Sequence, residues 1–395
     1  MAVRTDVAVL VDGSTISAVA AEAELRRTTG DAVIIDCEGG VLTPGFVDSH
    51  THAVFGRARY EEQELRAIGV PYMEIARRGG GIHSSVRDLR TRGEDELYEL
   101  AAPRLMSLAA SGVTTVEVKS GYGLSLEDEL KTLRVVQRLA ERLPLRVVPT
   151  FLGAHEIPME FRERSNGRRE YIELIVREMI PAVAAERLAR FADVFCEPGA
   201  FTPDESREIL TAARGAGLSL KLHADELVSA AGAELAASLG AVSADHLAAV
   251  SDTGIAALAS AGTVATLLPA TMLFLGAREQ APARRLVDAR VPVALATDFN
   301  PGTSPTTNFP LVLALGVSQL RLSAAEAIVA ATVNGAAALS LSERVGQVSA
   351  GFSADLALWA LEDARELPYW LGAGRCRASW ARGKPCHPHD LALAF

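Results

Sequence analysis

The sequence predicts an α/β fold, a (β/α)8 TIM-like barrel with a small β-sandwich domain formed by both termini. Three features of the 395-residue chain lead to this prediction. From about residue 41, a short β-branched run, a loop and an amphipathic helix recur as a unit. The apolar runs are almost uninterrupted, which is typical of parallel strands covered on both faces. The two ends of the chain contain strand-like runs without helical periodicity.

Eight barrel strands are expected, each a short run rich in hydrophobic and β-branched residues. In chain order they are residues 41–50, 113–120, 145–152, 191–197, 218–224, 241–247, 263–269 and 291–298. A doubly wound open sheet is the alternative for alternating strands and helices. It is disfavoured because no glycine-rich phosphate-binding loop follows the first strand.

Helices are expected between these strands. They are residues 94–111, 125–142, 168–185, 203–215, 229–239, 251–261 and 282–290. Ser125 and Thr202 stand where N-terminal caps are expected, and Pro203 follows near the first helical position. Gly112 and Gly262 stand where a helix ends before the next strand.

The ends of the chain differ from its middle. We expect residues 1–40 and 345–395 to form one composite β domain beside a barrel of residues 41–344, because each end alone has too few strands to bury a face. Two independent β appendages are the simpler alternative. Residues 56–93, which include RRGGGI (77–82), are too many for a plain βα connection, and such long loops are usually lids or binding loops.

The composition argues against several classes of protein. Hydrophobic residues make up 49% of the chain, yet no uninterrupted apolar run is long enough to span a membrane. The net charge of −10 and the lack of a basic run argue against nucleic-acid or membrane partners, so an anionic small molecule would need a locally placed cation. Asp6 and Asp12 interrupt the N-terminal apolar run, so we do not expect it to be a signal peptide. The four cysteines lack the spacing of a disulfide framework or of a zinc knuckle. We therefore expect a cytoplasmic protein.

Five of the eight histidines fall at or just after the ends of predicted strands. They are His50, His52, His155, His223 and His246. Asp298 ends the last predicted strand. In a (β/α)8 barrel the carboxyl ends of the strands share one face, where active sites are built. The sequence therefore predicts that these side chains meet at one mouth.

His50 and His52 stand two residues apart on a strand, so both imidazoles can face the barrel axis. With His223 and Asp298 they make a set of three histidines and one carboxylate, which suits Zn²⁺ or Fe. An ion with an open position would lower the pKa of a bound water to about 7. A closed structural site is the alternative, but structural zinc favours cysteine and none is suitably placed. One ion is expected, because the strand at 191–197 does not end in the lysine that bridges two ions in binuclear barrels.

Longer motifs surround these residues. PGFVDSHTH (44–52), with a later histidine and the aspartate ending the eighth strand, resembles the metal-dependent amidohydrolase superfamily. Further motifs resemble its imidazolonepropionase family, and this resemblance runs over nearly the whole chain. They are HTHAVFGRAR (50–59), GGGI (79–82), KSGYGL (119–124), TFLGAHEIP (150–158), KLHADE (221–226) and TDFNPGT (297–303).

The resemblance implies hydrolysis of 4-imidazolone-5-propanoate to N-formimidoyl-L-glutamate in histidine degradation, by a homodimer with one zinc or iron ion per subunit. The implied metal ligands are His50, His52, His223 and Asp298. The implied substrate contacts are Arg59, Tyr122, His155, Glu226, Asn300, Gly302 and Thr303. Arg57 and Ala58 depart from the family pattern, where relatives often carry small or acidic residues, so either Arg57 or Arg59 could reach the ligand.

Each implied contact has a physical role. A guanidinium donates two parallel hydrogen bonds to a propanoate carboxylate, and His155 is expected to donate to the oxyanion. His246 is a candidate to accept the proton of the attacking water, and Asp298 is a second candidate acceptor. Glu226 is a candidate to carry a proton to the leaving ring nitrogen. The catalytic residues expected from this reasoning are therefore Glu226, His246 and Asp298.

Simpler roles exist for three of these side chains. Glu226 could be a solvent-facing carboxylate at a helix start, His246 a core histidine bonded to a backbone carbonyl, and Tyr122 a packed aromatic. Cys386 and its neighbours in CHPH (386–389) are expected in a solvated loop.

Two rival functions use the same barrel. A purine- or pyrimidine-type deaminase, or another cyclic-amidine or lactam amidohydrolase, would keep the metal ligands but has no evident need for Arg59. A non-catalytic scaffold could lose a metal ligand without penalty, whereas this chain has all four.

Overall fold

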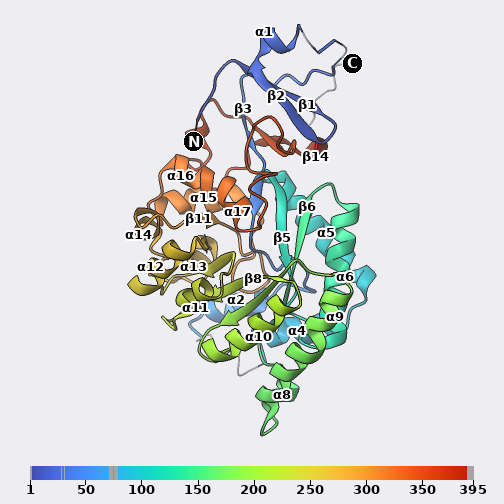
Figure 1. Ribbon diagram of the computed structural model, residues 1–395, viewed down its shortest axis with the longest axis vertical. Helices are drawn as coiled ribbons and strands as arrows, with labels where there is room; N and C mark the ends of the chain where they lie inside the picture. Colours follow the sequence, from blue (N-terminus) through green and yellow to red (C-terminus); the bar gives the residue numbers. More distant parts are fainter. Residues whose placement is uncertain (1, 28, 31, 71–73, 75–78, 389–395) are drawn as a thin grey trace.

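A parallel sheet of eight strands, curled into a barrel, forms the centre of the molecule (Figure 1). The computed structural model describes residues 2–27, 29–30, 32–70, 74 and 79–388. The strands neighbour one another in chain order, and all of them run parallel. They are β4 (Phe46–Asp48), β5 (Val113–Lys119), β6 (Arg146–Ala154), β7 (Phe191–Cys196), β8 (Ser219–Ala224), β9 (Ser243–His246), β10 (Val264–Leu267) and β11 (Val293–Leu295). The predicted (β/α)8 barrel is confirmed.

The first and last strands, β4 and β11, meet without a regular ladder. Thr51 and Phe299 form an isolated parallel bridge just beyond the two strands. The backbone N–H of His52 donates to the Phe299 carbonyl at 2.8 Å, and that of Asp298 donates to the His50 carbonyl at 3.0 Å. The hydrogen bonds that close the barrel therefore also fix the backbone of three predicted metal ligands.

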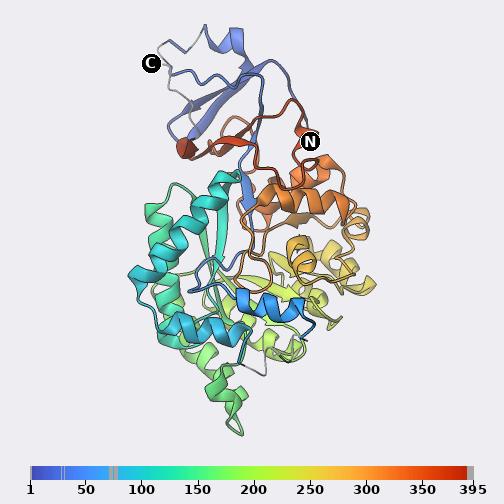
Figure 2. The ribbon, with the colours of Figure 1, turned by 180° about the vertical axis from the view of Figure 1, so that it is seen from behind.

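Helices surround the barrel on its outer side, as Figure 1 and the reverse view in Figure 2 show. They are α5 (Glu94–Ala110), α6 (Leu126–Arg142), α8 (Gly167–Leu174), α9 (Ile180–Ala185), α10 (Pro203–Gly215), α11 (Gly232–Ser238), α12 (Asp252–Ala261), α13 (Pro269–Phe274), α14 (Ala283–Asp288), α15 (Phe309–Ser318), α16 (Ala324–Ala330) and α17 (Val333–Ala337). All seven helices expected from the sequence are present. The helix expected at 168–185 contains a π-helical turn, η1 (Ile175–Met179). The pattern did not predict α13 or α15 to α17.

The expected helix ends are confirmed. The Ser125 side chain accepts the N–H of Asp128 at 3.2 Å at the start of α6. Thr202 and Glu205 form a reciprocal capping box at the start of α10. Gly262 ends α12 in the left-handed conformation, with φ of 69°, which costs glycine little because it has no Cβ.

A second, antiparallel sheet is built from both ends of the chain and lies at one end of the barrel (Figure 1). Its order is β14-β13-β12-β3, from β3 (Val41–Pro44), β12 (Leu356–Trp359), β13 (Cys376–Ala381) and β14 (Lys384–Pro388). The hairpin of β1 (Val7–Asp12) and β2 (Thr15–Ala21), followed by the short helix α1 (Glu22–Leu25), packs beside it. Ile16 from β2 is buried against Ala354 and Leu356. The expected β unit from both termini is confirmed, while its boundaries at residues 40 and 345 stay a prediction.

Three local expectations were wrong. Residues 41–50 are not one barrel strand, because β3 pairs with β12 and only β4 joins the barrel. The chain changes sheets at Gly45, where a Cβ would lie 2.1 Å from Thr114 Oγ1. The strand-like run at 31–40 forms no strand over its described residues 32–40, and Val33 is 76% exposed. Cys386 is buried in β14 rather than placed in a solvated loop.

The long segment at 56–93 contains α2 (Tyr60–Ala67) and α4 (Ile82–Arg90). Part of the RRGGGI motif, residues 77 and 78, lies outside the described residues. The remaining short helices are α7 (Met159–Arg162) and η2 (Ala364–Glu366).

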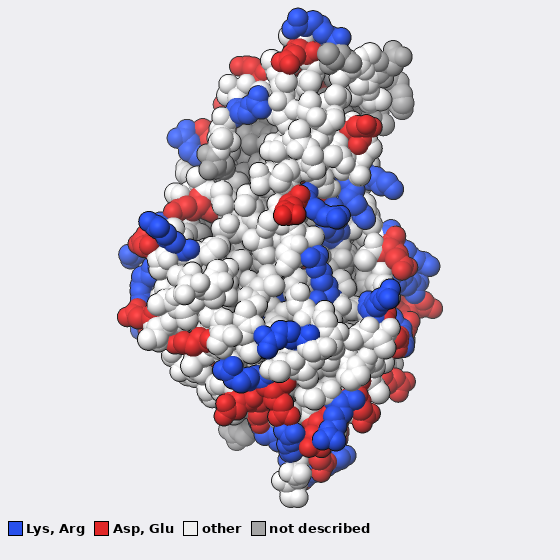
Figure 3. Space-filling model, in the orientation of Figure 1, with Lys and Arg blue, Asp and Glu red and all other residues white. Residues whose placement is uncertain are grey.

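Acidic and basic side chains are intermingled over the face seen in Figure 3. Ion pairs between α8 and α10 illustrate this, with Arg168–Glu205 and Arg169–Glu208 each at 2.6 Å. Within the described ranges, no helix is both long and apolar enough to cross a membrane.

Candidate active site

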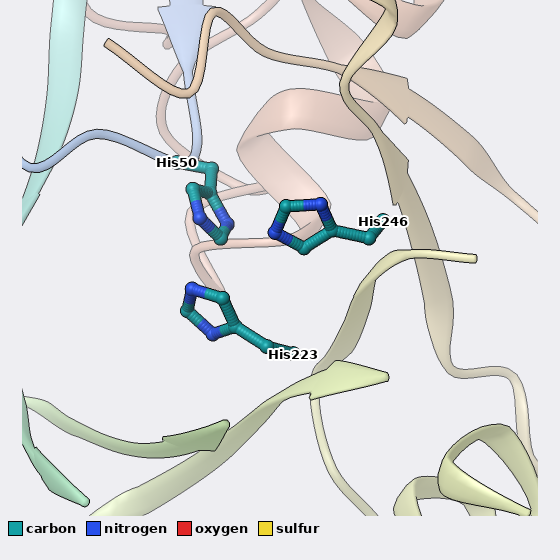
Figure 4. A group of neighbouring side chains, drawn as sticks. All are labelled: His50, His223 and His246. Carbon is teal, nitrogen blue, oxygen red and sulfur yellow. The ribbon is translucent and has the colours of Figure 1, made fainter. Parts of the chain in front are cut away.

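Five buried imidazoles meet at the carboxyl ends of the barrel strands. Ring centroids lie 4.5 Å apart for His50 and His223, 5.3 Å for His50 and His52, 5.1 Å for His52 and His155, and 5.2 Å for His223 and His246. Figure 4 shows three of these rings approaching one another from separate strand ends. The predicted convergence of the histidines on one mouth is therefore observed.

Asp298 completes a group with His50 and His52. Its Oδ1 lies 3.6 Å from His50 Nε2 and 3.5 Å from His52 Nε2. Its other oxygen, Oδ2, accepts a hydrogen bond from Thr271 Oγ1 at 2.7 Å. Oδ2 of Asp298 is thus engaged by Thr271, and Oδ1 faces both imidazoles.

His50 also belongs to a second group of possible ligands, with His223 and His246. The ligand atoms of each group lie within 4.8 Å of one another. The predicted set of His50, His52, His223 and Asp298 is thus spread over two overlapping groups that share His50. His246, which the sequence analysis assigned to proton transfer, lies as close to this centre as the predicted ligands.

The chemistry of the donor atoms fits a metal ion. His50 Nε2 and His223 Nε2 are buried and have no hydrogen-bond partner among the described residues. A buried polar atom without a partner is costly, and a lone pair offered to a metal removes that cost. Burial lowers the pKa of His50 and His52 well below its usual value, with further contributions from nearby cationic groups, so both rings are in the neutral, ligating form.

Two carboxylates that the sequence analysis missed hold the imidazoles from behind. Asp245 Oδ2 lies 2.6 Å from His50 Nδ1, and Asp193 Oδ1 lies 3.1 Å from His223 Nδ1. A usable signal was present, because charged residues inside otherwise apolar strands of a closed barrel must find buried partners. The runs FADVFC and SADH each contain such an aspartate.

Arg59 lies in the mouth, whereas Arg57 does not. Arg59 is 7% exposed, and its Nε and Nη1 have no hydrogen-bond partner in the part of the chain that is described. Its nearest carboxylate is Glu62, at 3.7 Å from Nε. The Arg57 side chain is 62% exposed and faces Glu61 at 4.0 Å. Of the two arginines, Arg59 is therefore the one placed in the mouth, while its contact with a substrate stays a prediction.

The turn after β11 packs against Arg59. A Cβ on Gly302 would lie 1.1 Å from Arg59 Nη2, so only glycine leaves room for the guanidinium. Asn300 Oδ1 accepts the N–H groups of Gly302 and Thr303, each at 2.8 Å. Gly302 and Thr303 are among the implied substrate contacts, and in this structure Asn300 engages the N–H groups of both.

His155 lies against both His52 and Tyr122, with a ring separation of 5.5 Å from Tyr122. Its Nδ1 is 3.0 Å from the Gly121 carbonyl oxygen, which can only accept, so Nδ1 carries the proton. Burial is the main reason that the pKa of His155 falls to about 3, and His223 and Arg59 lower it further. The neutral ring therefore presents Nε2 as an acceptor, which does not fit the expected donor role toward an oxyanion.

Glu226 lies beside His246, with its Oε1 3.6 Å from His246 Nδ1. Its side chain is 12% exposed, so it is not the solvent-facing carboxylate of the simpler interpretation. Burial raises the pKa of Glu226 to about 8, and the neighbouring Asp298 and Glu197 raise it as well. Glu226 therefore holds a proton at neutral pH.

A third missed carboxylate, Glu129, shapes the loop that contains Tyr122. Its Oε1 accepts the N–H groups of Gly123 and Leu124, each at 2.8 Å. Glu129 lies in the first turn of α6, where acidic residues are common, so the sequence pattern gave no separate sign of this role.

Comparison with protein families and curated proteins extends these observations. A model of the amidohydrolase family matches residues 41–385. The chain is 45% identical over 380 residues to an imidazolonepropionase from Geobacillus kaustophilus, covering 95% of this chain and 89% of that protein. It is 48% identical over 373 residues to an imidazolonepropionase from Symbiobacterium thermophilum, covering 93% and 87%.

Solved structures with the same fold include two deaminases. An adenosine deaminase from Xanthomonas campestris with bound zinc superposes with a TM-score of 0.73 at 20% identity, covering 96% of this chain and 88% of that chain. A 5-methylcytosine deaminase from Klebsiella pneumoniae superposes with a TM-score of 0.76 at 18% identity, covering 97% and 94%. At these identities the similarity shows the barrel fold.

Proposed function

The chain belongs to the amidohydrolase family and, within it, to the imidazolonepropionases, and on this basis we propose that its mouth hydrolyses the lactam ring of 4-imidazolone-5-propanoate. The product is N-formimidoyl-L-glutamate, an intermediate of histidine degradation. The enzyme is thus a hydrolase that acts on a C–N bond. The deaminase alternative is not favoured, because the deaminases resemble this chain at only 18–20% identity.

The observation that carries this proposal is the buried guanidinium of Arg59. Two of its nitrogen atoms have no hydrogen-bond partner among the residues described, and its charge acts on His155 across the mouth. A propanoate carboxylate supplies the two acceptors that such a guanidinium needs. A neutral purine or pyrimidine ring can offer hydrogen-bond acceptors but no negative charge, so it would leave the buried positive charge of Arg59 uncompensated.

The family and the buried His and Asp donors support a divalent metal. We propose one zinc or iron ion, held by His50, His52, His223 and Asp298. When bound, such an ion polarises the lactam carbonyl and lowers the pKa of a water molecule.

The remaining side chains orient the substrate and move protons. We propose that His155 accepts a hydrogen bond at Nε2 from a ring N–H of the substrate, since its Nδ1 donates to Gly121. The same mouth is bordered by Tyr122 and by the turn that contains Asn300, Gly302 and Thr303. The geometry of this turn supports a role of its three residues in holding Arg59.

Glu226 and His246 form the proposed proton-transfer pair. The protonated Glu226 holds the proton that the leaving ring nitrogen needs, and neutral His246 can accept the proton that the attacking water loses. Asp298 is a second acceptor, and burial raises its pKa to about 6.

The direct test is incubation of metal-loaded protein with 4-imidazolone-5-propanoate and detection of formimidoylglutamate by mass. The matched control is the Glu226→Gln variant, which keeps the shape of the side chain and removes the proton. We expect product from the wild type and about a 100-fold or greater loss of kcat in the variant. Absence of product, together with deamination of a purine or pyrimidine, would overturn the proposal.

We also propose that the protein acts in the cytoplasm as a homodimer without nucleic-acid or membrane partners. The overall acidity of the chain and its resemblance to the imidazolonepropionases support this part of the proposal. Sedimentation equilibrium of the purified protein tests it, and a single species with the 41.8 kDa mass of one chain would contradict the dimer.

A further inference from the structure

Five charged side chains lie buried inside the barrel, beneath the imidazoles. They are Glu117, Lys119, Asp193, Lys221 and Asp245, and none is more than 1% exposed. Buried ion pairs contribute little net stability, because the cost of removing the charges from water offsets their attraction. The presence of five such charges in one core therefore points to a role besides stabilising the fold.

Two of the carboxylates orient imidazoles of the candidate metal site. Asp245 Oδ2 lies 2.6 Å from His50 Nδ1. Asp193 Oδ1 accepts the backbone N–H of His223 at 3.1 Å and lies 3.1 Å from its Nδ1. His50 Nδ1 is thus held by a hydrogen bond, whereas His223 Nδ1 faces Asp193 at ion-pair distance without meeting hydrogen-bond geometry. Nε2 of each ring has no hydrogen-bond partner among the described residues and remains for a metal.

Lys119 contacts both of these carboxylates. Its Nζ lies 2.7 Å from Asp193 Oδ2 and 3.7 Å from Asp245 Oδ2, the oxygen that also binds His50. A third carboxylate, Glu117, lies 2.9 Å from the same Nζ. One cation thus connects the supports of ligands on two different strands.

The backbone of Lys119 contacts the segment that bears His50 and His52. Its N–H donates at 2.9 Å to the carbonyl of Thr51, which stands between His50 and His52. Burial alone would lower the pKa of Lys119, but Asp193, Glu117 and a third carboxylate raise it above its ordinary value. Lys119 is therefore a fixed positive charge.

Lys221 is equally buried but is connected differently. Its Nζ donates to the Ser49 carbonyl at 2.7 Å and lies 3.1 Å from Glu117 and 3.5 Å from Asp245. It makes no ion pair with Asp193 among the described contacts. Lys221 is thus a matched comparison that shares the burial and the network but lacks the contact behind His223.

We propose that Lys119 is a positioning residue of the metal site, which acts through Asp193 on His223. The inference rests on the proposed function, because it takes His223 as a ligand. It predicts that metal affinity depends on Lys119 more strongly than on Lys221.

The test compares Zn²⁺ affinity, by competition with a chelator, in wild type, Lys119→Met and Lys221→Met. We expect Lys119→Met to weaken binding about 10- to 100-fold, the range usual for residues that support metal ligands. Lys221→Met is expected to weaken it much less. We also expect the visible absorption of the Co²⁺-loaded protein to change in Lys119→Met, because the ligand geometry changes.

Asp193→Asn gives an independent test that keeps the size of the side chain. The double variant combines Lys119→Met with Asp193→Asn. If Lys119 acts through Asp193, the double variant should bind Zn²⁺ about as weakly as whichever single variant binds it more weakly, since the effects of coupled residues are not additive. If Lys119→Met does not fold, unchanged affinity in Asp193→Asn would still overturn the proposal. Equal losses of Zn²⁺ affinity in Lys119→Met and Lys221→Met would also overturn it. So would a double variant whose loss of binding free energy equals the sum of the two single losses.

The same preparations separate this proposal from the proposed function. A wild-type protein that binds Zn²⁺ but makes no formimidoylglutamate contradicts the reaction, and the affinity comparison then still decides the role of Lys119. A wild-type protein that forms product while Lys119→Met keeps full Zn²⁺ affinity contradicts only the role of Lys119.

Discussion

The guanidinium of Arg59 is enclosed by the mouth on one side and by the glycine turn after β11 on the other. Its contact with Glu62, at 3.7 Å, is too long for a hydrogen bond. A charge that is buried and incompletely paired is costly, so its retention indicates that a ligand supplies the missing partner. At the scale of single residues, the proposed recognition of the substrate therefore depends on Arg59 and on the space that surrounds it.

We predict that Arg59→Met lowers kcat/KM for 4-imidazolone-5-propanoate about 100-fold or more, mostly through KM, because two charge-assisted hydrogen bonds are lost. The metal content of the variant should be unchanged, since Arg59 is not one of the predicted metal ligands. Arg57→Met is the control, because its side chain is 62% exposed, and steady-state kinetics should show little change. An unchanged KM in Arg59→Met would contradict the assigned role.

Gly302 allows a second test of the same contact without altering the charge. An alanine there would place Cβ 1.1 Å from Arg59 Nη2, so the flexible guanidinium must move. We predict about a 100-fold loss in kcat/KM, as expected for a displacement of about 1 Å in a positioned group, with little change in thermal stability. Gly374→Ala is the control, because a Cβ at that position meets nothing within 4 Å. Equal kinetics in the two variants would show that the position of Arg59 is not critical.

At the scale of elements, an ion pair that depends on pH links α14 to α16. Arg284 from α14 makes two contacts of 3.1 Å with the Glu326 carboxylate, which also caps the start of α16 through Ser323. The hydrogen bond from Arg284 is the main reason that the pKa of Glu326 falls to about 2, from an ordinary value of 4.5. The charged form of Glu326 is thus preferred in the folded state.

The sign of the pH effect follows from this shift. Because the folded pKa is depressed, the contribution of Glu326 to stability is fully present above pH 4.5 and is lost as the pH falls toward 2. We predict that Glu326→Gln is less stable than wild type at pH 7 and that the difference shrinks between pH 4.5 and 3. Urea unfolding at several pH values measures it. A difference that does not change with pH would exclude the ionised carboxylate as its cause.

The elements also show what the sequence could and could not predict. The eight strands and the caps at Ser125 and Thr202 followed from periodicity and local chemistry, which act over short distances. The end of β3 at Pro44 and the change of sheets at Gly45 did not, because they depend on the pairing of β3 with β12 and of β4 with β5, both far away in sequence. Tertiary contacts of this kind decide strand ends but leave no local pattern.

The candidate site divides in the same way. The histidines and Asp298 could be predicted to meet because the strand ends of a barrel share one face. The supports at Asp193 and Asp245, and the acceptor tautomer of His155, depend on pairings across the barrel that only the structure reveals. The sequence therefore predicted which groups meet at the mouth better than how they are oriented.

At the scale of the whole molecule, the barrel depends on the seam between β4 and β11. Where a ladder is missing, the buried Asp48 carboxylate accepts the N–H of Thr297 at 3.0 Å and its hydroxyl at 2.6 Å. The Thr297 hydroxyl in turn accepts the N–H of Phe299 at 3.0 Å. This chain of bonds lies directly below the backbone that fixes His50 and Asp298, so closure of the barrel and assembly of the site are coupled.

We predict that Thr297→Val lowers the free energy of unfolding by about 2–4 kcal/mol, because the Asp48 carboxylate loses a buried donor and the Phe299 N–H loses an acceptor. The seam should also open more often, so the N–H of His52, which bonds across it, should exchange with solvent faster than in wild type. Thr266→Val is the control, because the Thr266 hydroxyl is buried without a hydrogen-bond partner among the described residues, and its removal should leave stability unchanged or increased. If Thr297→Val unfolds like Thr266→Val, or if exchange accelerates equally on strands remote from β4 and β11, the seam does not limit the stability of the barrel.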